Sequence, residues 1–339
     1  MSAMAQAWGG PGGCGRLRSE PEDFRVEEIL GFAPDGAGEH VLLWIEKRGA
    51  NTGDVVEALA RFAGVRASAI GTSGRKDRHA VTGQWFSVHL PGREEPDWSD
   101  FSGEHWWVQR AERHGRKLRT GTHRANRFRL RVRDFSGDRD AVEVRLARIA
   151  TDGFPNYFGP QRFGQAGENL RRARALFAGS IRPRRSLRSI YLSAARSWLF
   201  NRVLAARVAD GSWLQALPDD ALMLAGRRSM FRCTGEETDL ASRIVAGDLH
   251  VTGPLWGRGT RVAGTAAHAR EREWVAGDVD LVAGLEAVGM EADRRALRAS
   301  AAGLDWGFDD DTLELAFELE SGVFATALLF EVVDTATVA

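Results

Sequence analysis

The feature that most constrains the fold of this chain is a change in hydrophobic period along it. Short runs over residues 23–133 alternate apolar and polar side chains, as half-buried strands do. After Gly164 the apolar residues recur every three or four positions, as in amphipathic helices, and alternation returns at Leu313–Leu319. A β-rich region that is interrupted by helices and then resumed is typical of one domain inserted into another. The predicted fold class is α+β.

The clearest predicted strand is Asn126–Arg133. Phe128, Leu130 and Val132 alternate with arginines, so the strand has one apolar and one basic face. By parity Asn126 lies on the apolar side, and a buried amide requires a hydrogen-bond partner. That partner is either a substrate or a neighbouring backbone group.

Other segments are assigned from the same periodicities. Thr52 is expected to be the N-cap of a helix that Gly64 ends, and residues 221–233 read as a hairpin. Residues 324–333 form either a helix or a strand that leads into one. Strands are predicted over 23–29, 41–45 and 85–90, and helices over 139–151, 168–178, 189–209, 236–246, 263–275, 278–288 and 291–299.

Composition limits the class of protein. The chain has 339 residues, of which 43% are hydrophobic and 27% charged, as in folded globular proteins. We expect no membrane span, because the apolar runs are strand-length, and no secretory signal, because no basic stretch leads into an apolar run at the N-terminus. Two distant cysteines, Cys14 and Cys233, exclude a disulfide framework and a cysteine-based zinc site, and they fit the reducing cytoplasm. The histidines are scattered, so no metal is expected.

The charges are balanced in number but not in position. There are 46 basic and 46 acidic residues. Basic residues concentrate over 110–133 and 171–188, whereas acidic residues gather over 94–100 and 309–320. Such blocks form either a positive face for phosphate or a solvated surface that distant acids neutralise. Charge alone does not decide between these alternatives.

One carboxylate stands out. Asp77 lies in the segment Ser73–Trp85, directly before a predicted strand, and is flanked by Arg75, Lys76 and Arg78. Nearby cations favour an ionised carboxylate, which is a competent nucleophile or base when it is desolvated against a substrate. These residues alone, however, favour an ordinary charged turn in which Asp77 is a salt-bridge partner.

The context of Asp77 changes that balance. Six segments, in order along nearly the whole chain, carry recognisable motifs, and the longest is Pro155–Gly164 (PNYFGPQRFG). The others are Ser19–Val26, Gly74–Trp85, Asn126–Phe128, Leu192–Asn201 and Ser321–Thr326. Together they resemble the TruD family of tRNA pseudouridine synthases. The resemblance implies a pseudouridine synthase catalytic domain with a mixed, mostly antiparallel sheet and a largely helical inserted TRUD domain.

The expected domain boundaries combine the resemblance with the periodicity. Residues 16–153 and 301–339 are assigned to the catalytic domain and residues 154–300 to the inserted domain. Residues 1–15 are rich in Gly and Ala and are expected to be a flexible N-terminus.

The resemblance also implies an activity. The family isomerises uridine to pseudouridine in tRNA, at position 13, and needs neither metal nor cofactor. Asp77 falls on the catalytic aspartate, which acts on a uridine that has left its stack. Whether it attacks the sugar, adds to the base or removes a sugar proton is left open. The expected partner is tRNA, with no metal and no membrane, and the expected state is a monomer.

Three site residues gain a role from the same comparison. Arg18 is the candidate cation for Asp77, where the family typically has lysine; the alternative is a solvated residue before a turn. Phe24 and Phe324 match aromatic positions near the substrate, where a ring stacked on a flipped base contributes ~1–3 kcal/mol. Their alternative is core packing, which is strong for Phe24.

The predicted substrate-binding set is completed by Asn126, Asn156 and Arg162. Arg162 either contacts RNA or anchors its loop. Besides Arg18, the chain departs from the family pattern at Ala125, where glycine is usual, and at Phe330, where arginine is common. A glycine at a position of positive φ would make Ala125 costly.

Two rival functions stay open. The first is a non-catalytic RNA-binding or tRNA-folding protein on the same scaffold, against which Asp77 and its motif argue. The second is a structural or metabolic α+β protein with a charged surface loop, which would need the ordered motifs to arise by accident.

Overall fold

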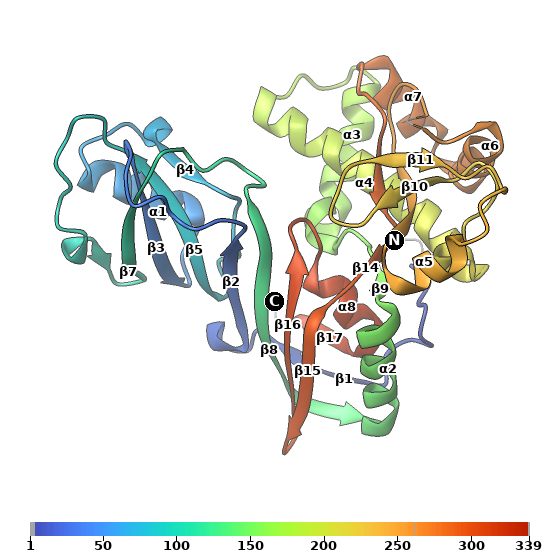
Figure 1. Ribbon diagram of the computed structural model, residues 1–339, viewed down its shortest axis with the longest axis horizontal. Helices are drawn as coiled ribbons and strands as arrows, with labels where there is room; N and C mark the ends of the chain where they lie inside the picture. The colour runs from blue at the N-terminus through green and yellow to red at the C-terminus, as the bar shows by residue number, and fades with distance from the viewer. Residues whose placement is uncertain (1–3, 261, 338–339) are drawn as a thin grey trace. The chain divides into compact units, whose positions relative to one another are not determined.

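A computed structural model of the chain describes residues 4–260 and 262–337. The chain divides into two compact units, each assembled from segments that are far apart in sequence. The sheet unit comprises Gly12–Leu146, Ala301–Gly322 and Val333–Ala339, and the helical unit comprises Met1–Pro11, Ala147–Ser300 and Val323–Val332. The colours of Figure 1 show both units drawing on early and late parts of the chain.

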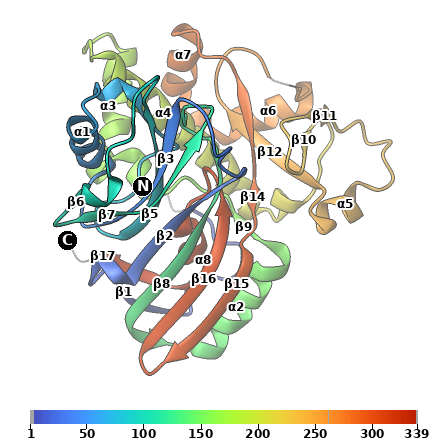
Figure 2. The same ribbon diagram turned by 60° about the vertical axis from the view of Figure 1, so that its left-hand side comes forward.

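The sheet unit is built on an 11-stranded sheet with a central path β15-β16-β8-β2-β5-β3-β7-β6. Figure 2 shows β2, β8, β16 and β15 side by side. The pairs β2–β5 and β1–β17 are parallel and the other pairs are antiparallel, which confirms the predicted mixed sheet. The strands are β1 (Gly13–Leu17), β2 (Phe24–Leu30), β3 (His40–Arg48), β4 (Ile70–Thr72), β5 (Val81–His89), β6 (Ser102–Gly103), β7 (Trp106–His114), β8 (His123–Gly137), β15 (Ala302–Asp309), β16 (Thr312–Glu320) and β17 (Asp334–Thr337).

Strand β8 is the long strand that organises this sheet. It pairs with β2 on one side and β16 on the other, and it shows the predicted alternation over a longer span than expected. Val26 and Phe317 lie directly opposite Phe128, while Phe24 lies opposite Leu130. The Phe128 ring stacks on Phe317 with centroids 5.4 Å apart and meets Phe24 edge-on at 6.1 Å. These contacts form the apolar face that the sequence predicted.

Helix α1 (Thr52–Phe62) begins one residue earlier than predicted. Its N-cap is Asn51, not Thr52, and the Asp54 carboxylate accepts a hydrogen bond from the Asn51 backbone in a capping box. Thr52 is thereby free for another contact. Its hydroxyl accepts a hydrogen bond from the Lys76 backbone at 3.0 Å and donates one to Gln84 at 3.1 Å. The helix start thus holds the segment next to Asp77.

The helical unit contains α3, α4 and α7, which share one apolar core (Figure 1). The predicted helices over 168–178, 189–209, 263–275 and 278–288 and the hairpin over 221–233 are confirmed. Besides α2 (Arg139–Asp152), which enters from the sheet unit, its elements are β9 (Phe154–Pro155), α3 (Glu168–Phe177), α4 (Arg185–Ala209), β10 (Ala221–Leu224), β11 (Met230–Arg232), α5 (Leu240–Ala246), β12 (Leu249–Leu255), α6 (Thr265–Trp274), α7 (Val279–Ala287), β13 (Asp293–Ala296), β14 (Arg298–Ala299) and α8 (Ala325–Val332).

The helix predicted over 291–299 was wrong. The segment forms β13, which pairs with β12, and then β14. The buried Arg294 guanidinium donates to the Thr252 hydroxyl at 2.7 Å and to its carbonyl at 2.9 Å, and it forms an ion pair with Glu271. A buried guanidinium needs these partners, and they outweigh the helix propensity of the local sequence.

Part of the N-terminal segment expected to be flexible makes specific contacts. Gly13–Leu17 form β1 between β8 and β17. The Trp8 indole donates to the Gly153 carbonyl at 2.9 Å, and the Tyr157 hydroxyl donates to the Ala5 carbonyl at 2.9 Å.

Within the described residues, no helix combines the length and the apolar character that crossing a membrane requires.

The indole of Trp44 occupies the space beside Gly83 in β5, and a substitution at Gly83 tests this packing. A Cβ at this position would lie 2.2 Å from Cζ2 of Trp44, whose indole lies across the strand. We expect Gly83→Ala to lower the free energy of unfolding by ~1–3 kcal/mol, because the indole must leave its place. Gly307→Ala in β15 is the matched control, because nothing lies within 4 Å of its added Cβ. Denaturant titration compares the two variants, and equal midpoints would contradict this packing.

Candidate active site

Asp77 lies in the loop that joins β4 to β5. Its Oδ2 forms an ion pair with Nη2 of Arg18 at 2.7 Å. The Asp77 side chain is 51% exposed and the Arg18 side chain 24% exposed. The carboxylate is therefore accessible from solvent, while the cation beside it is more firmly enclosed. This contact brings together the two residues that the sequence predicted as catalytic.

Arg18 is held in a specific conformation. It follows β1 with φ at 64°, in the left-handed region, which costs a residue other than glycine roughly 1–2 kcal/mol. Its guanidinium lies over the Phe24 ring, 4.1 Å from the centroid. The next turn is fixed by the buried carboxylate of Asp23, which accepts a hydrogen bond from Nε of Arg133 at 2.8 Å. The arginine that faces Asp77 is thus set by its ring contact and by the turn that follows.

The backbone at Asp77 is held by a buried lysine. Nζ of Lys47, in β3, donates to the Asp77 carbonyl at 2.9 Å and to the Ala50 carbonyl at 2.7 Å. Burial lowers the pKa of Lys47 from 10.5 to about 8, although the negative charge of Asp77 opposes that shift. The ammonium lies within the protein and fixes the loop through a main-chain oxygen.

The residue before Asp77 is anchored as well. Nζ of Lys76 forms a buried ion pair with Glu28 at 2.6 Å, and the other Glu28 oxygen accepts a hydrogen bond from the Trp85 backbone at 3.0 Å. The Gln84 side chain donates to the Gly74 carbonyl at 2.5 Å. Contacts from β2, β3, β5 and α1 therefore fix the backbone around Asp77 and leave its carboxylate exposed.

Asn126 lies opposite Glu28 on the inner face of the sheet and is buried, as its parity predicted. Its Nδ2 lies 3.2 Å from Nε2 of His123. Burial and the charge of Lys76 lower the pKa of His123, which fits a neutral ring that accepts this hydrogen bond. Oδ1 of Asn126 is buried and has no hydrogen-bond partner among the described residues. An unpartnered buried amide atom is unusual and is a candidate contact for a substrate.

Three further predicted substrate-binding residues, Asn156, Arg162 and Phe324, lie in the helical unit. Phe324 precedes α8, and its ring centroid is 5.9 Å from that of Phe158. The Arg162 guanidinium lies 5.7 Å from the Phe324 ring and 5.5 Å from the Phe158 ring. Nη1 of Arg162 donates to the Ser193 hydroxyl at 3.2 Å, and burial lowers the pKa of Arg162.

Asn156 in this second group is engaged by the protein itself. Its Nδ2 donates to the Ala296 carbonyl at 2.9 Å, and its Oδ1 accepts a hydrogen bond from Arg295. The Arg295 guanidinium lies 4.3 Å from the Phe158 ring centroid. Burial, followed by the charge of Arg162, lowers the pKa of Arg295 to about 9. Arg295 was not predicted as a site residue, because its segment was expected to be a helix.

The predicted residues thus form two groups. Asp77, Arg18 and Phe24 are in contact in the sheet unit, and Asn126 is linked to them through Glu28 and Lys76. Asn156, Arg162 and Phe324 share contacts around Phe158 in the helical unit. Phe24 is only 3% exposed, which agrees with the packing alternative for its ring.

The two further departures from the family pattern have local explanations. Ala125 lies within β8 and does not have positive φ, so no glycine is needed there. Phe330 lies in α8, where its ring meets Tyr157 edge-on at 6.2 Å and its carbonyl accepts a hydrogen bond from Gln6.

Among the described residues, no group of three or more His, Cys, Asp or Glu side chains is arranged to hold a metal ion. The chemistry that the geometry offers is that of an accessible carboxylate on an immobilised loop, paired with one guanidinium. Such a group can act as a nucleophile or as a base. A mixed, mostly antiparallel sheet that carries this loop agrees with the pseudouridine synthase domain that the sequence motifs imply.

Comparison with known proteins is more specific. The family described as tRNA pseudouridine synthase D (TruD) matches residues 3–182 and 169–332. A curated relative from Methylococcus capsulatus named tRNA pseudouridine synthase D is 48% identical over 94% of this chain and 91% of its own length. A relative of the same name from Aeromonas salmonicida is 43% identical over 98% of this chain and 94% of its own. The chain therefore belongs to the TruD family of tRNA pseudouridine synthases.

A solved structure agrees with this fold. A crystal structure from Methanosarcina mazei, described as a candidate tRNA pseudouridine synthase D, superposes with a TM-score of 0.74. The match covers 96% of this chain and 95% of the other at 19% identity. The arrangement of elements is thus shared although the sequences have diverged.

The buried ammonium of Lys47 predicts a pH dependence of stability. Its pKa is about 8 in the folded protein and 10.5 when exposed, so the unfolded chain binds the proton more tightly. The resulting destabilisation is complete below pH 8 and is lost as the pH rises toward 10.5. We expect the wild type to gain stability relative to Lys47→Met over this interval, as measured by urea titration at each pH. A difference between the two proteins that does not vary with pH would rule out a buried charge.

Proposed function

We propose that this chain isomerises uridine to pseudouridine in tRNA, at position 13, with Asp77 as the catalytic nucleophile on a flipped-out uridine. Membership of the TruD family supports the reaction class. The observation that carries the role of Asp77 is its ion pair with Arg18 at 2.7 Å on an accessible, anchored loop. A surface turn in which Asp77 is only a salt-bridge partner does not account for a buried lysine that holds its backbone.

The reaction breaks the bond between the sugar and N1 of the base, turns the base, and joins the sugar to C5. No atom is gained or lost. Among the described side chains, only Arg18 is bonded to the Asp77 carboxylate, and it uses Oδ2 alone, so Oδ1 is open to the substrate. Attack on the sugar, addition to the base and removal of a sugar proton each require such an oxygen. The proposal leaves the choice among these three routes open.

The other site residues take roles that fit their contacts. Asn126 offers its unpartnered amide atom to the base, and the partly exposed Phe324 ring offers a surface on which a base can stack. Arg162 contacts the RNA from the helical unit. We assign Phe24 and Asn156 to the site through the arginines that they hold, Arg18 and Arg295.

The context of the reaction is part of the same proposal. The catalytic domain is residues 16–153 and 301–339, most of which lie in the sheet unit, and the inserted TRUD domain is residues 154–300, which lie in the helical unit. The protein acts as a monomer in the cytoplasm, with tRNA as its partner and without a metal or cofactor.

Asp77→Asn tests the proposed nucleophile. The amide keeps the size of the side chain but loses the charge, so pseudouridine should fall below detection in an unmodified tRNA transcript. Chemical mapping of pseudouridine in the transcript measures the product, and a binding assay shows whether the variant still takes up tRNA. Product retained by the variant would remove Asp77 from the reaction. Binding without product in the wild type would favour the non-catalytic RNA-binding alternative.

Lys47→Met tests whether the loop anchor positions Asp77. Methionine fills similar space but donates no hydrogen bond to the Asp77 carbonyl. Because a displacement of about 1 Å can cost 10²-fold in rate, we expect kcat to fall by roughly that factor with little change in KM. Lys117→Met, at an exposed lysine, is the control and should leave kcat unchanged. An equal loss in both variants would show that Lys47 has no specific positioning role.

A further inference from the structure

The arginines of β8 and the arginines at the start of α4 differ in how the fold compensates their charge. On β8, Arg127 pairs with Glu318 at 2.8 Å and with Glu27 at 3.7 Å, and Arg131 pairs with Glu314 at 2.8 Å. The outer face of the sheet therefore alternates in sign instead of presenting a continuous positive surface.

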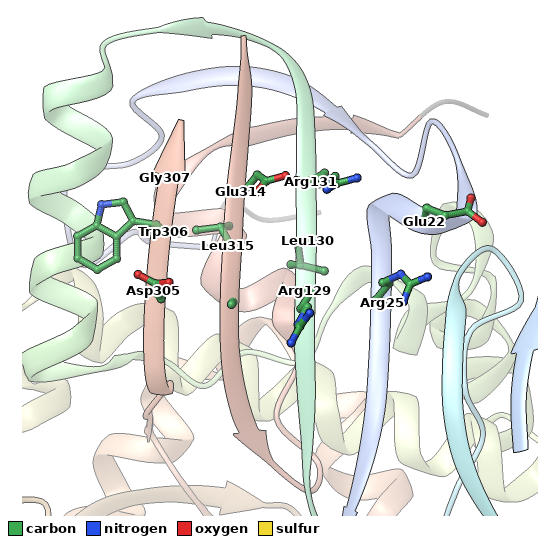
Figure 3. Close-up of a pocket in the computed structure, with 11 residues that line it drawn as sticks. Glu22, Arg25, Arg129, Leu130, Arg131, Asp305, Trp306, Gly307, Glu314 and Leu315 are labelled. Carbon is green, nitrogen blue, oxygen red and sulfur yellow. Dashed lines mark hydrogen bonds and ion pairs between the residues drawn. The ribbon is translucent and has the colours of Figure 1, made fainter. Parts of the chain in front are cut away.

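Figure 3 shows this outer face around a hollow of about 620 Å³. Arg131 lies beside Glu314, its ion-pair partner, and Glu22 lies at the rim. Arg129 is the exception on this face, because its cross-strand neighbours are Ala316 and Arg25. Most of the positive charge that the sequence places on β8 is thus neutralised within the sheet unit.

The arginines that lead into α4 have no such compensation. Arg182, Arg184, Arg185 and Arg188 make no ion pair with any described carboxylate, and the first three are exposed. The sequence explains why, since residues 169–209 contain neither Asp nor Glu. Four unpaired positive charges lie within seven residues.

This arrangement costs the folded protein stability. Arg184 and Arg185 each lie within one helical turn of Arg188, where like charges repel. The same charges stand at the positive end of the helix dipole, and no acidic residue in the first turn offsets them. Unpaired like charges at the start of a helix are unfavourable in the protein alone. Such an arrangement is expected where a negatively charged ligand pairs with these charges.

We propose that Arg182–Arg188 is the surface through which the helical unit contacts the sugar-phosphate backbone of its RNA substrate. The inference rests on the proposed function, and it assigns the phosphate contacts to this segment instead of the β8 arginines. The ligand is a run of phosphate groups, each of which can take a bidentate guanidinium contact. The exposed Leu187 and Ile190 lie among these arginines and can cover the sugar edges between phosphates.

The segment is continuous with the second group of site residues. Ser193, whose hydroxyl accepts the hydrogen bond from Arg162, lies eight residues after Arg185 in α4. Eight residues of α-helix span about 12 Å. A strand of RNA held at the start of α4 is therefore within about two helical turns of the residues around Phe158 and Phe324.

The salt dependence of tRNA binding tests this proposal, because each phosphate contact that is lost changes the slope of log K against log salt. The double variant R184Q/R185Q is compared with R171Q/R172Q, which removes the same charge from arginines of α3 that pair with Glu168. We expect R184Q/R185Q to make the slope shallower by about 1.4–1.8, at ~0.7–0.9 per contact. We expect R171Q/R172Q to leave the slope close to that of the wild type.

Either of two results would overturn the proposal. One is a slope of log K against log salt in R184Q/R185Q that equals the wild-type slope. That result would indicate that the arginines bind another acidic partner, such as a protein. The other is an equal reduction in both variants, which would show a general effect of net charge. The thermal midpoint of R184Q/R185Q should not fall, because the substitutions relieve repulsion at the start of α4. The slopes are measured without catalysis, so failure of the proposed function, seen as a wild type that makes no pseudouridine, is a separate result.

Discussion

The hydrogen bond from Lys47 to the carbonyl of Asp77 is the contact on which the candidate active site depends most. A carboxylate on an exposed loop has no fixed direction unless its backbone is held. Lys47 supplies that restraint from inside the sheet, while Thr52 and the Lys76–Glu28 pair hold the neighbouring residue. The side chain that would do chemistry is thereby exposed on a backbone that is not free to move.

Holding Asp77 through the buried Lys47 ammonium costs the folded protein stability. A buried ammonium whose partners are two carbonyl oxygens is harder to keep charged than one beside a carboxylate, which is why burial dominates the lowered pKa of Lys47. A methionine at the same place would avoid that cost. Retaining a lysine makes sense if the position of Asp77 matters more than the stability of β3. Arg18 also lowers stability at the site, because its own backbone adopts a strained positive φ while its side chain contacts Asp77.

The periodicity of the sequence predicted the features that are set within a single strand or helix, such as which face a side chain occupies. Asn126 was placed on the buried face because alternate residues of a strand share a face, and the structure puts it there beside His123. The helix predicted over 291–299 failed because Arg294 takes its partners, Thr252 and Glu271, from segments that local sequence does not link to it. Arg295 was missed for the same reason. The helix N-cap was predicted at Thr52 but lies at Asn51, because both side chains can cap a helix. The two are distinguished by the hydrogen bond of Thr52 with Lys76, which the local sequence does not reveal.

The departure at Arg18 shows how a changed residue can keep its charge and gain a contact. Where the family typically has lysine, the guanidinium of Arg18 reaches Asp77 at 2.7 Å while its flat face lies over Phe24 at 4.1 Å. A lysine ammonium is a compact point charge and has no flat face to lay on a ring. The arginine can therefore be fixed by stacking on an aromatic ring that is itself buried against Phe128. The burial of Phe24 is therefore explained without a contact between its ring and the substrate. Phe24 supports the site by holding Arg18, which pairs with Asp77.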